Sequence, residues 1–538
     1  MDLGSLVAGT INDTVAVSLP LFRTELAIAA TVVLVLLCRM LPVLRWLDSG
    51  LVALGGGCFA AWYAWDDLLI LQEAAVGYRQ ELFGGLLVFD SLTAYIRFLL
   101  AGFLVLYILF TKVSGIPDRE DGADFYVLVL GATLGMCLMA SANHLLMVFM
   151  AIEMASVPSY ALAGFLKGRK ASSEAALKYA VYGAGAAGIM LYGISLLGGV
   201  LGTFHLPSMA AEMGELVGGG GGGGEVTVLV IGGLMLAVGL AFKLSAVPFH
   251  FWCPDVFEGA AAEVGAFLSV ASKAAAVALA VRLVFGLGTL PATADVVAIA
   301  GLADVRHFMV YLIGGMAAIT CTLGNLAAYG QTNMKRLLAY STVAHAGYLM
   351  MGLAAATALA GVDAAGARQA VAALAFYLGT YLFMNLAAFA IVAVLRNRLR
   401  SEEISAYAGL VQTSPGIVVA TVVVLVSLIG LPPLAGFVGK FLVFSSLVNA
   451  ISLTGERPLM LVLLVIGGLN TVISLFYYLR VLKVMTFDPL PEGRVAEPSS
   501  AFSFAGGLIT ALSVPVVVLG VFWSGLYEFA KAAGLFAS

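Results

Sequence analysis

The sequence predicts an all-α protein that crosses a membrane about fourteen times, and three observations lead to this fold class. Of the 538 residues, 62% are hydrophobic and only 11% are charged, whereas soluble domains carry about 25% charged residues. Apolar windows of roughly 20 residues, long enough to cross a bilayer as helices, recur along the whole chain. Basic residues gather in every second connection between these windows, as in other polytopic membrane proteins.

The apolar windows fix the expected helices in order. They lie near residues 21–41, 50–70, 86–110, 125–142, 143–166, 174–200, 226–248, 260–285, 307–329, 335–357, 370–396, 414–450, 458–485 and 503–526. We expect four parts: three N-terminal helices (1–124), two five-helix repeats (125–285 and 286–485) and one C-terminal helix (486–538).

Two of the expected spans look broken. Pro248 and Pro254 interrupt the segment "KLSAVPFHFWCPDVFEG", and a double proline interrupts "GLPPLAGFVGK". Proline removes helical hydrogen bonds, and non-helical backbone is tolerated at membrane depth only inside a protein or a wet cavity. Because broken helices in corresponding places mark inverted repeats, and five helices per repeat would turn one repeat upside down, we expect two inverted repeats with one broken helix each.

The basic residues predict the orientation. Arg39 and Arg45 follow the first apolar window, which puts the N-terminus outside, and with fourteen spans both termini lie on the outer side. This arrangement places fifteen basic residues in cytoplasmic connections and seven in outer ones.

Other patterns exclude several classes of function. The five cysteines show no metal-ligand spacing, and the histidines are scattered, so iron–sulfur, haem and structural metal sites are not expected. The seven glycines at Gly218–Gly224 predict a flexible outer connection without an assigned function.

Five ionisable residues stand within the apolar windows. Lys273 lies at the centre of "AEVGAFLSVASKAAAVALAVRLV", and the others lie at comparable depth: Glu153, Lys243, His345 and Lys440. A charge at this depth costs several kcal/mol unless something stabilises it, so such residues mark functional sites by default. The alternative is a buried structural ion pair. Arg97 and Lys178 lie nearer to helix ends, where a long cationic side chain commonly reaches the interface.

Together these residues predict a path for protons. Burial disfavours the ammonium form of a lysine and a nearby carboxylate restores it, so Glu153 and Lys243 are the expected loading pair. Lys273, His345 and Lys440 would then pass protons laterally, and free histidine titrates near neutral pH, which suits this task.

Several motifs now resemble a known family. "IEMASVPSYALAGF", "SSEAALKYAVYGA", "AFKLSAVPFHFWCPDVFEGA", "GNLAAYGQTNMKRLLAYSTVAHAGYLMMG" and "GLPPLAGFVGKF" resemble the antiporter-like membrane subunits of proton-pumping NADH:quinone oxidoreductase, respiratory complex I, and among them the subunit N family most. The resemblance covers about residues 86–485. In that family a glutamate, three lysines and a histidine line a polar axis, which by motif correspond to Glu153, Lys243, Lys273, His345 and Lys440.

The resemblance implies more than the residues themselves do. It implies a subunit of a bacterial inner (plasma) membrane translocase that carries no redox centre. NADH, FMN, iron–sulfur clusters and quinone are then expected in partner subunits, and neighbouring antiporter-like subunits are expected to contact this chain. No nucleic acid is implied.

One segment departs from the family pattern. After "PDVFEGA" the family usually has a proline-containing segment, whereas this chain has Ala261 and Glu263. Glu263 is therefore expected to add a charge near the cytoplasmic entrance, while Lys335 and Arg336 are expected to be ordinary positive anchors on that side.

Three other classes of function remain open. A subunit of a multisubunit cation/proton antiporter would share the fold and the lysines, but sodium transport would ask for more acids within the spans than Glu153. A membrane scaffold would hold its neighbours and transport nothing. A stand-alone redox enzyme fits least, because the sequence shows no pattern of haem, flavin or cluster ligands.

Overall fold

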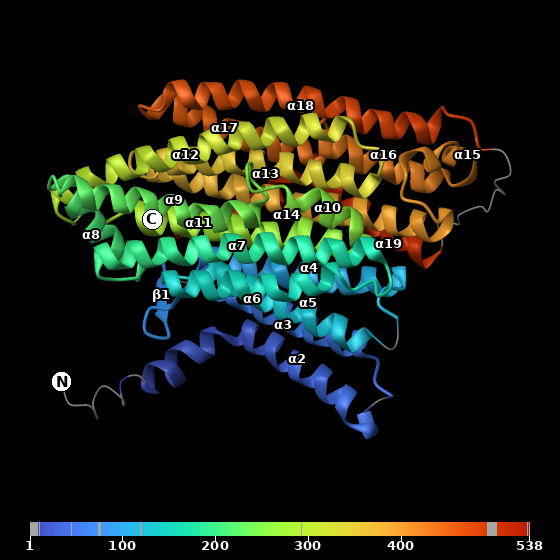
Figure 1. Cartoon of the computed structure of the whole chain (residues 1–538), viewed down its shortest axis with the longest axis horizontal. Helices are drawn as coiled ribbons and strands as arrows, with labels where there is room; N and C mark the ends of the chain where they lie inside the picture. Colours follow the sequence, from blue (N-terminus) through green and yellow to red (C-terminus); the bar gives the residue numbers. More distant parts are fainter. Residues whose placement is uncertain are drawn as a thin grey trace.

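The computed structural model is a bundle of long helices that run side by side (Figure 1). It describes residues 11–44, 46–73, 77–118, 121–291, 293–491 and 503–534, together with Gly9 and Phe536. Three arginines that entered the count of cytoplasmic charges, Arg45, Arg119 and Arg494, lie outside the described residues.

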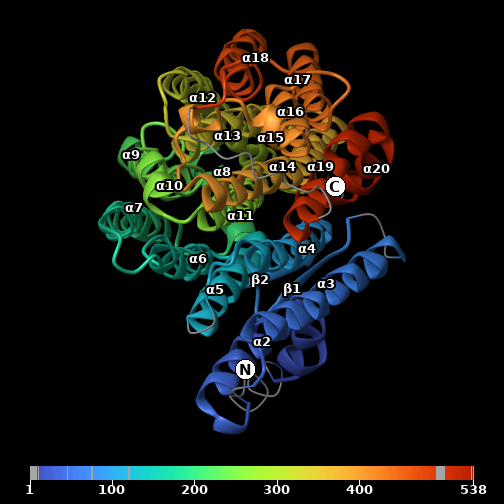
Figure 2. The ribbon, with the colours of Figure 1, turned by 90° about the vertical axis from the view of Figure 1, so that its right-hand side faces the viewer.

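The N-terminal part lies at one edge of the molecule, with α2 and α3 farthest from the rest (Figure 2). A β-hairpin follows α3 and leads directly into α4, with Arg79 paired to Asp90 and Leu82 to Leu87. The elements of this part are α2 (Arg23–Met40), α3 (Ser49–Glu73), β1 (Arg79–Leu82), β2 (Leu87–Asp90) and α4 (Ser91–Ser114).

The next part packs against α4 and ends in the most deeply buried helix of the bundle. Its elements are α5 (Gly122–Ser141), α6 (Leu145–Ala163), α7 (Lys170–Leu201), α8 (Leu206–Gly218), α9 (Gly223–Leu244), α10 (Trp252–Gly259) and α11 (Ala262–Gly288).

The remaining helices surround the other side of α11. They are α12 (Val296–Tyr329), α13 (Met334–Leu359), α14 (Ala364–Leu399), α15 (Leu410–Thr413), α16 (Pro415–Ile429), α17 (Ala435–Leu453), α18 (Arg457–Thr486), α19 (Phe504–Val521) and α20 (Trp523–Gly534). The core lies along α11, α13 and α14, whose most apolar stretches are 100%, 94% and 89% buried, whereas α12 and α18 bury only 22% and 28% and face outwards.

The predicted all-helical membrane fold is confirmed, but the predicted count of about fourteen spans is not. Among the described residues, twelve helices are long and apolar enough to cross a membrane, or thirteen if the bent pair Asp13–Leu21 and α2 forms one span. The second expected span coincides with α3, which has the length of a span but carries Asp66, Asp67 and Glu73 in its last turns. The division into three helices, two inverted repeats and a last helix stays a prediction.

Both expected breaks are present. Helix α9 ends at Leu244, Ser245 takes a left-handed backbone conformation (φ 58°), and the chain turns before α10. Helix α16 ends at Ile429, Gly430 is left-handed (φ 89°), and α17 begins after Pro432 and Pro433. Each break therefore leaves the C-terminal carbonyl groups of a half-helix inside the bundle, where they carry a partial negative charge.

Contacts between helix ends define the two ends of the bundle. Asn397 donates to the carbonyl of Ser114, Arg396 pairs with Glu263, and Lys335 donates to the carbonyl of Ala260, so α4, α14, α11 and α13 have these ends in common. We call this the basic end; it is the end that the sequence predicts to be cytoplasmic. The opposite end carries β1 and β2, and we call it the hairpin end.

Candidate functional site

The five residues singled out by the sequence come from five different helices of the bundle. Lys243, Lys273, His345 and Lys440 are each 1–3% exposed, whereas Glu153 on α6 is half-buried. Four buried basic groups within one chain require polar partners, since an unpaired buried charge is strongly destabilising. The structure supplies these partners one by one.

Glu153 and Lys243 lie near each other but do not touch. Lys243, in the last turn of α9, donates a hydrogen bond to Ser156 Oγ at 2.9 Å. Ser156 lies on α6, three residues after Glu153, so the carboxylate and the ammonium group lie close enough to interact electrostatically. Among the described residues no ion pair joins Glu153 directly to Lys243. A small movement of either helix would therefore make or weaken this interaction.

The broken segment between α9 and α10 separates Lys243 from Lys273. Cys253 on α10 lies near Lys273 and near Ser245, which caps α9. Its thiol also donates to the carbonyl of Ala339 at 3.8 Å. The break thus places two small polar side chains between the first and the second buried lysine.

Lys273 and His345 meet through α13. The Lys273 ammonium donates to the carbonyl oxygen of Thr342 at 2.5 Å, three residues before His345. His345 Nδ1 lies 2.6 Å from the hydroxyl of Tyr377 on α14. Lys273 and His345 therefore occupy adjacent turns of one polar seam between α11, α13 and α14.

Lys440 binds the end of the broken half-helix α16. Its ammonium donates to the carbonyl oxygens of Ile429 (2.8 Å) and Leu428 (3.3 Å), where the helix dipole favours a cation. It also lies 4.3 Å from the ring centroid of Tyr348, in cation–π contact. The Tyr348 ring lies 6.0 Å from the ring of His345, so the seam continues from His345 to Lys440.

Sequence reasoning missed a polar ladder on α14. Tyr377, Tyr381 and Asn385 follow one another at four-residue spacing and so share one face of the helix. Tyr381 donates to Thr342 Oγ1 at 3.4 Å. Asn385 is fully buried, and neither of its side-chain polar atoms has a hydrogen-bond partner in the described part of the chain. The spacing is visible in "FYLGTYLFMNLAAF", but nothing in these letters distinguishes a polar seam from an ordinary helix face.

The basic end carries a network of ion pairs rather than simple anchors. Lys335, expected to be an ordinary anchor, is 3% exposed, binds Glu402 at 2.8 Å and donates to Ala260. Arg336, expected to behave likewise, bridges acidic residues of α10. Both expectations miss these partners. The network includes Lys178–Glu174, Lys178–Asp255, Arg336–Asp255, Arg336–Glu258 and Arg396–Glu263.

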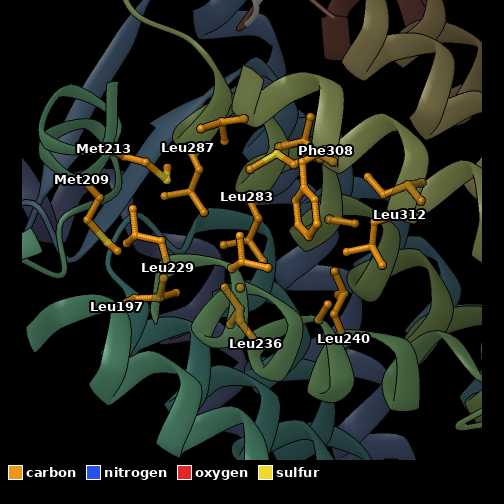
Figure 3. A pocket seen from close by; sticks show the side chains of 18 of the residues that line it. Leu197, Met209, Met213, Leu229, Leu236, Leu240, Leu283, Leu287, Phe308 and Leu312 are labelled. Atoms are coloured by element: carbon orange, nitrogen blue, oxygen red, sulfur yellow. The ribbon is translucent and has the colours of Figure 1, made fainter. Parts of the chain in front are cut away.

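A large cavity of the molecule lies apart from the polar seam. It has a volume of about 270 Å³ and lies between α7, α8, α9, α11, α12 and α13, with leucine, methionine and phenylalanine side chains pointing into it (Figure 3). Asp304 is the only charged residue among the described residues that line it. Since apolar cavities stay dry, this cavity is not suited to carry protons.

The seam has no obvious metal-binding group. Within the described ranges no three histidine, cysteine or acidic side chains come together in a way that could hold a metal ion. The side chains that lie along the seam carry amine, imidazole, carboxyl, hydroxyl and amide groups, which can form hydrogen bonds with one another and with water.

Comparison with known proteins places this arrangement in a family context. The family model "NADH:quinone oxidoreductase/Mrp antiporter, TM" matches residues 142–469, which contain Glu153 and the four buried basic residues. "NADH-quinone oxidoreductase subunit N 2" of Sorangium cellulosum is 39% identical over 526 residues, covering 96% of this chain and 97% of that protein.

Two solved structures extend the comparison to three dimensions. A chain of respiratory complex I from Thermus thermophilus with bound aureothin superposes with a TM-score of 0.71 at 29% identity, covering 94% of this chain and 98% of that one. A chain of the Mrp complex from Dietzia sp. DQ12-45-1b superposes with a TM-score of 0.72 at 19% identity, covering 98% and 97%. The second likeness concerns the fold alone.

Proposed function

This chain belongs to the NADH:quinone oxidoreductase/Mrp antiporter family, and on that premise we propose that it is the proton-translocating subunit N of an NADH:quinone oxidoreductase. It is a multi-pass membrane protein and a member of a multisubunit respiratory complex. The bacterial inner membrane, with both termini on the periplasmic side, is the location that fits the distribution of basic residues.

The observation that carries the proposal is the polar seam across the middle of the bundle. The seam begins at Glu153 and Lys243, passes the Ser245–Cys253 break, and reaches Lys273 and His345 beside α13. It ends at Lys440 of α17, which contacts Tyr348 of α13. We call these five ionisable residues the row. A helix bundle needs no such row for stability, because each buried ammonium group costs free energy that apolar packing would not. Proton transfer gives the row a function.

Each residue then has a role in the transfer. A nearby carboxylate favours the charged form of a lysine. Lys243 therefore binds a proton when Glu153 approaches it and releases the proton when the two side chains separate. Lys273 and His345 are the next proton-carrying groups of the row, with Thr342 and Tyr377 as their partners. Lys440, held against the carbonyl end of α16, is the last basic group of the row.

Redox chemistry belongs to other subunits in this proposal. We assign NADH, FMN, the iron–sulfur clusters and quinone to partner chains, and neighbouring antiporter-like subunits to the outward-facing helices such as α12 and α18. Energy released by electron transfer there would move Glu153 and Lys243 relative to each other.

The first prediction tests the row directly in the assembled complex. Lys273→Ala or Glu153→Ala should abolish or greatly reduce NADH-driven proton pumping into membrane vesicles, while the complex still assembles. Lys531→Ala is the matched control, because Lys531 is an exposed lysine on α20 that contacts its own helix, through an ion pair with Glu528 and a cation–π contact with Tyr527. Undiminished pumping in the Lys273→Ala and Glu153→Ala complexes would refute the proposal.

Two further readouts separate the alternatives. A complex purified in mild detergent through this chain should contain further subunits and oxidise NADH. A multisubunit antiporter would also contain further subunits, but it would not oxidise NADH. A scaffold subunit would tolerate neutral substitutions of Lys243, Lys273, His345 and Lys440 without loss of pumping.

A further inference from the structure

Outside the row described above, α11 carries a buried acid close to its start. Glu263, in the first turn of this helix, is fully buried and accepts two hydrogen bonds from Arg396, at 3.1 Å from Nη2 and 3.3 Å from Nη1. Arg396 lies in the last turn of α14, and its side chain is 11% exposed. The pair therefore joins the surface at the basic end to the interior of the bundle.

The pair has charged neighbours of both signs. Lys335 and Glu402 lie next to it and balance each other. Tyr107 on α4 lies near Glu263, and its buried hydroxyl has no hydrogen-bond partner among the described residues. Tyr407 lies near Arg396 and Glu402. Glu263 is thus more deeply buried than Glu402, the other acid of this cluster. It also lies on the same helix as Lys273.

Helix geometry relates the pair to Lys273. Glu263 and Lys273 are ten residues apart on α11, which is about 15 Å along the axis. Because Glu263 near the start of α11 contacts Arg396 near the end of α14, the two helices run antiparallel. Asn385, eleven residues before Arg396, therefore lies at about the depth of Lys273.

Asn385 marks a place for water at that depth. Its amide lies beside Tyr381, whose hydroxyl contacts Thr342, the residue that also binds Lys273. Both polar atoms of Asn385 lack partners among the described residues, and leaving such groups unsatisfied costs about 1–3 kcal/mol each. Buried unsatisfied groups of this kind are commonly met by internal water.

The ring of Phe389 lies between the Glu263–Arg396 ion pair and the side-chain amide of Asn385. Phe389 lies four residues after Asn385, on the same face of α14 and towards Arg396. It packs on Gly265 so closely that a Cβ there would approach Phe389 Cε1 to 2.8 Å, and its ring lies 5.8 Å from that of Phe257. In this conformation the polar groups on the two sides of Phe389 are separated by an apolar layer.

We propose that Glu263 and Arg396 take up protons at the basic end for delivery to Lys273, and that Phe389 is the gate between them. This inference rests on the proposed function of the row. A proton from solvent protonates the Glu263 carboxylate while Arg396 turns to Asn397, whose side-chain oxygen it already contacts at 3.1 Å. When Phe389 moves aside, the carboxyl proton passes through water at Asn385 to the neutral amine of Lys273. Glu263 is then again a carboxylate, Lys273 is an ammonium, and no electrons move.

The second prediction concerns the acid. In vesicles holding the complete complex, Glu263→Gln should lower the ratio of protons pumped to NADH oxidised to the value of Lys273→Ala. Glu258→Gln, which removes an acid from an exposed ion pair at the same end, should leave the ratio unchanged. If Lys273→Ala lowers the ratio and Glu263→Gln does not, the uptake role is wrong. If Lys273→Ala itself has no effect, the proposed function fails instead.

The gate is tested separately, so that a folding defect of Glu263→Gln cannot hide the answer. Vesicles with Phe389→Ala complex should dissipate an imposed pH gradient several-fold faster than wild type in the absence of NADH, because the small side chain leaves room for water. Phe389→Leu should keep the barrier. Adding Glu263→Gln or Lys273→Ala to Phe389→Ala should remove the leak. A leak that persists in these double variants, or no leak in Phe389→Ala, would overturn the gate.

Discussion

At the scale of single residues, Arg97 shows what a buried charge requires. Its guanidinium, expected to reach the membrane interface, has no exposed surface and binds Glu25 of α2 (2.7 Å) and Asp67 of α3 (3.2 Å). The expectation that Arg97 reaches the interface is therefore wrong. The sequence does not reveal this pairing, because the two acids are 72 and 30 residues away in the chain. Arg97 and Lys273 look alike in sequence, yet only Arg97 is paired with carboxylates.

The third prediction follows from this pairing. Arg97→Met should destabilise the complex by about 3–5 kcal/mol, because it leaves the buried Glu25 carboxylate without a cation and takes one of its two cations from Asp67, which keeps Arg23. The thermal denaturation midpoint of the detergent-solubilised complex measures the loss. The triple variant with Glu25→Gln and Asp67→Asn should recover most of it, and an unchanged midpoint in Arg97→Met alone would contradict the structural role.

The same scale explains which site residues the sequence could predict. Lys243, Lys273, His345 and Lys440 stand out because each is ionisable within an apolar window, and burial of all four is what the structure shows. Asn385 and Tyr381 carry no charge, and such residues are common on ordinary helix faces. Their significance depends on which helix lies opposite, and sequence spacing alone does not contain this information.

At the scale of secondary-structure elements, the breaks were more predictable than the spans. Proline and glycine act locally, so both interruptions lie where the sequence places them. Whether a helix crosses the membrane depends also on charges that tertiary pairing can neutralise. In helix α3, Asp66 and Asp67 both pair with Arg23, and Asp67 also pairs with Arg97. A hydropathy window counts these two acids only as polar residues and does not register their partners.

The fourth prediction addresses the break at α16. Gly430→Ala should reduce pumping and cost about 1–2 kcal/mol, because its left-handed backbone disfavours a Cβ atom. The new Cβ would also approach Lys440 Cδ to 2.9 Å and displace the ammonium from the carbonyl groups of α16. The proton-to-NADH ratio is the readout.

A matched control exists on α4. A Cβ at Gly102 would meet no atom within 4 Å, and alanine favours the helix, so Gly102→Ala should leave both stability and pumping intact. Equal pumping by the Gly430→Ala complex and wild type would show that the backbone of the break does not position Lys440.

At the scale of the whole molecule, an ion pair between Asp90 and Arg282 joins the hairpin end to the core helix. Asp90, the last residue of β2, accepts hydrogen bonds from Nη1 and Nη2 of Arg282 on α11, and the distance from Nη2 is 2.8 Å. Arg282 also donates to the carbonyl of Ala140 on α5, and Asp90 caps α4 by accepting from the Thr93 amide at 3.0 Å. This joint connects the N-terminal helices to the core helix that carries Lys273.

The pH dependence of this joint can be derived from Asp90. Burial opposes ionisation of Asp90, but the Arg282 charge and the hydrogen bonds from Arg282 and Thr93 outweigh it, and its pKa lies below the ordinary value of 3.8. An acid whose pKa is lowered on folding contributes stability fully above its unfolded pKa and loses it as the pH falls through the folded pKa. The contribution of Asp90 should therefore be constant throughout the neutral range.

The fifth prediction compares Asp90→Asn with wild type across pH. Near pH 7 the variant should be destabilised by about 3–5 kcal/mol, because Arg282 is left buried without its acid, and thermal denaturation of the purified complex measures this deficit. The deficit should stay constant between about pH 8 and pH 5 and shrink only on further acidification, because wild-type Asp90 then becomes neutral too. Asp48→Asn, which removes an exposed partner of Lys112, should give a much smaller deficit at every pH. A deficit for Asp90→Asn that disappears between pH 8 and pH 6 would mean that another group holds the hairpin end to α11.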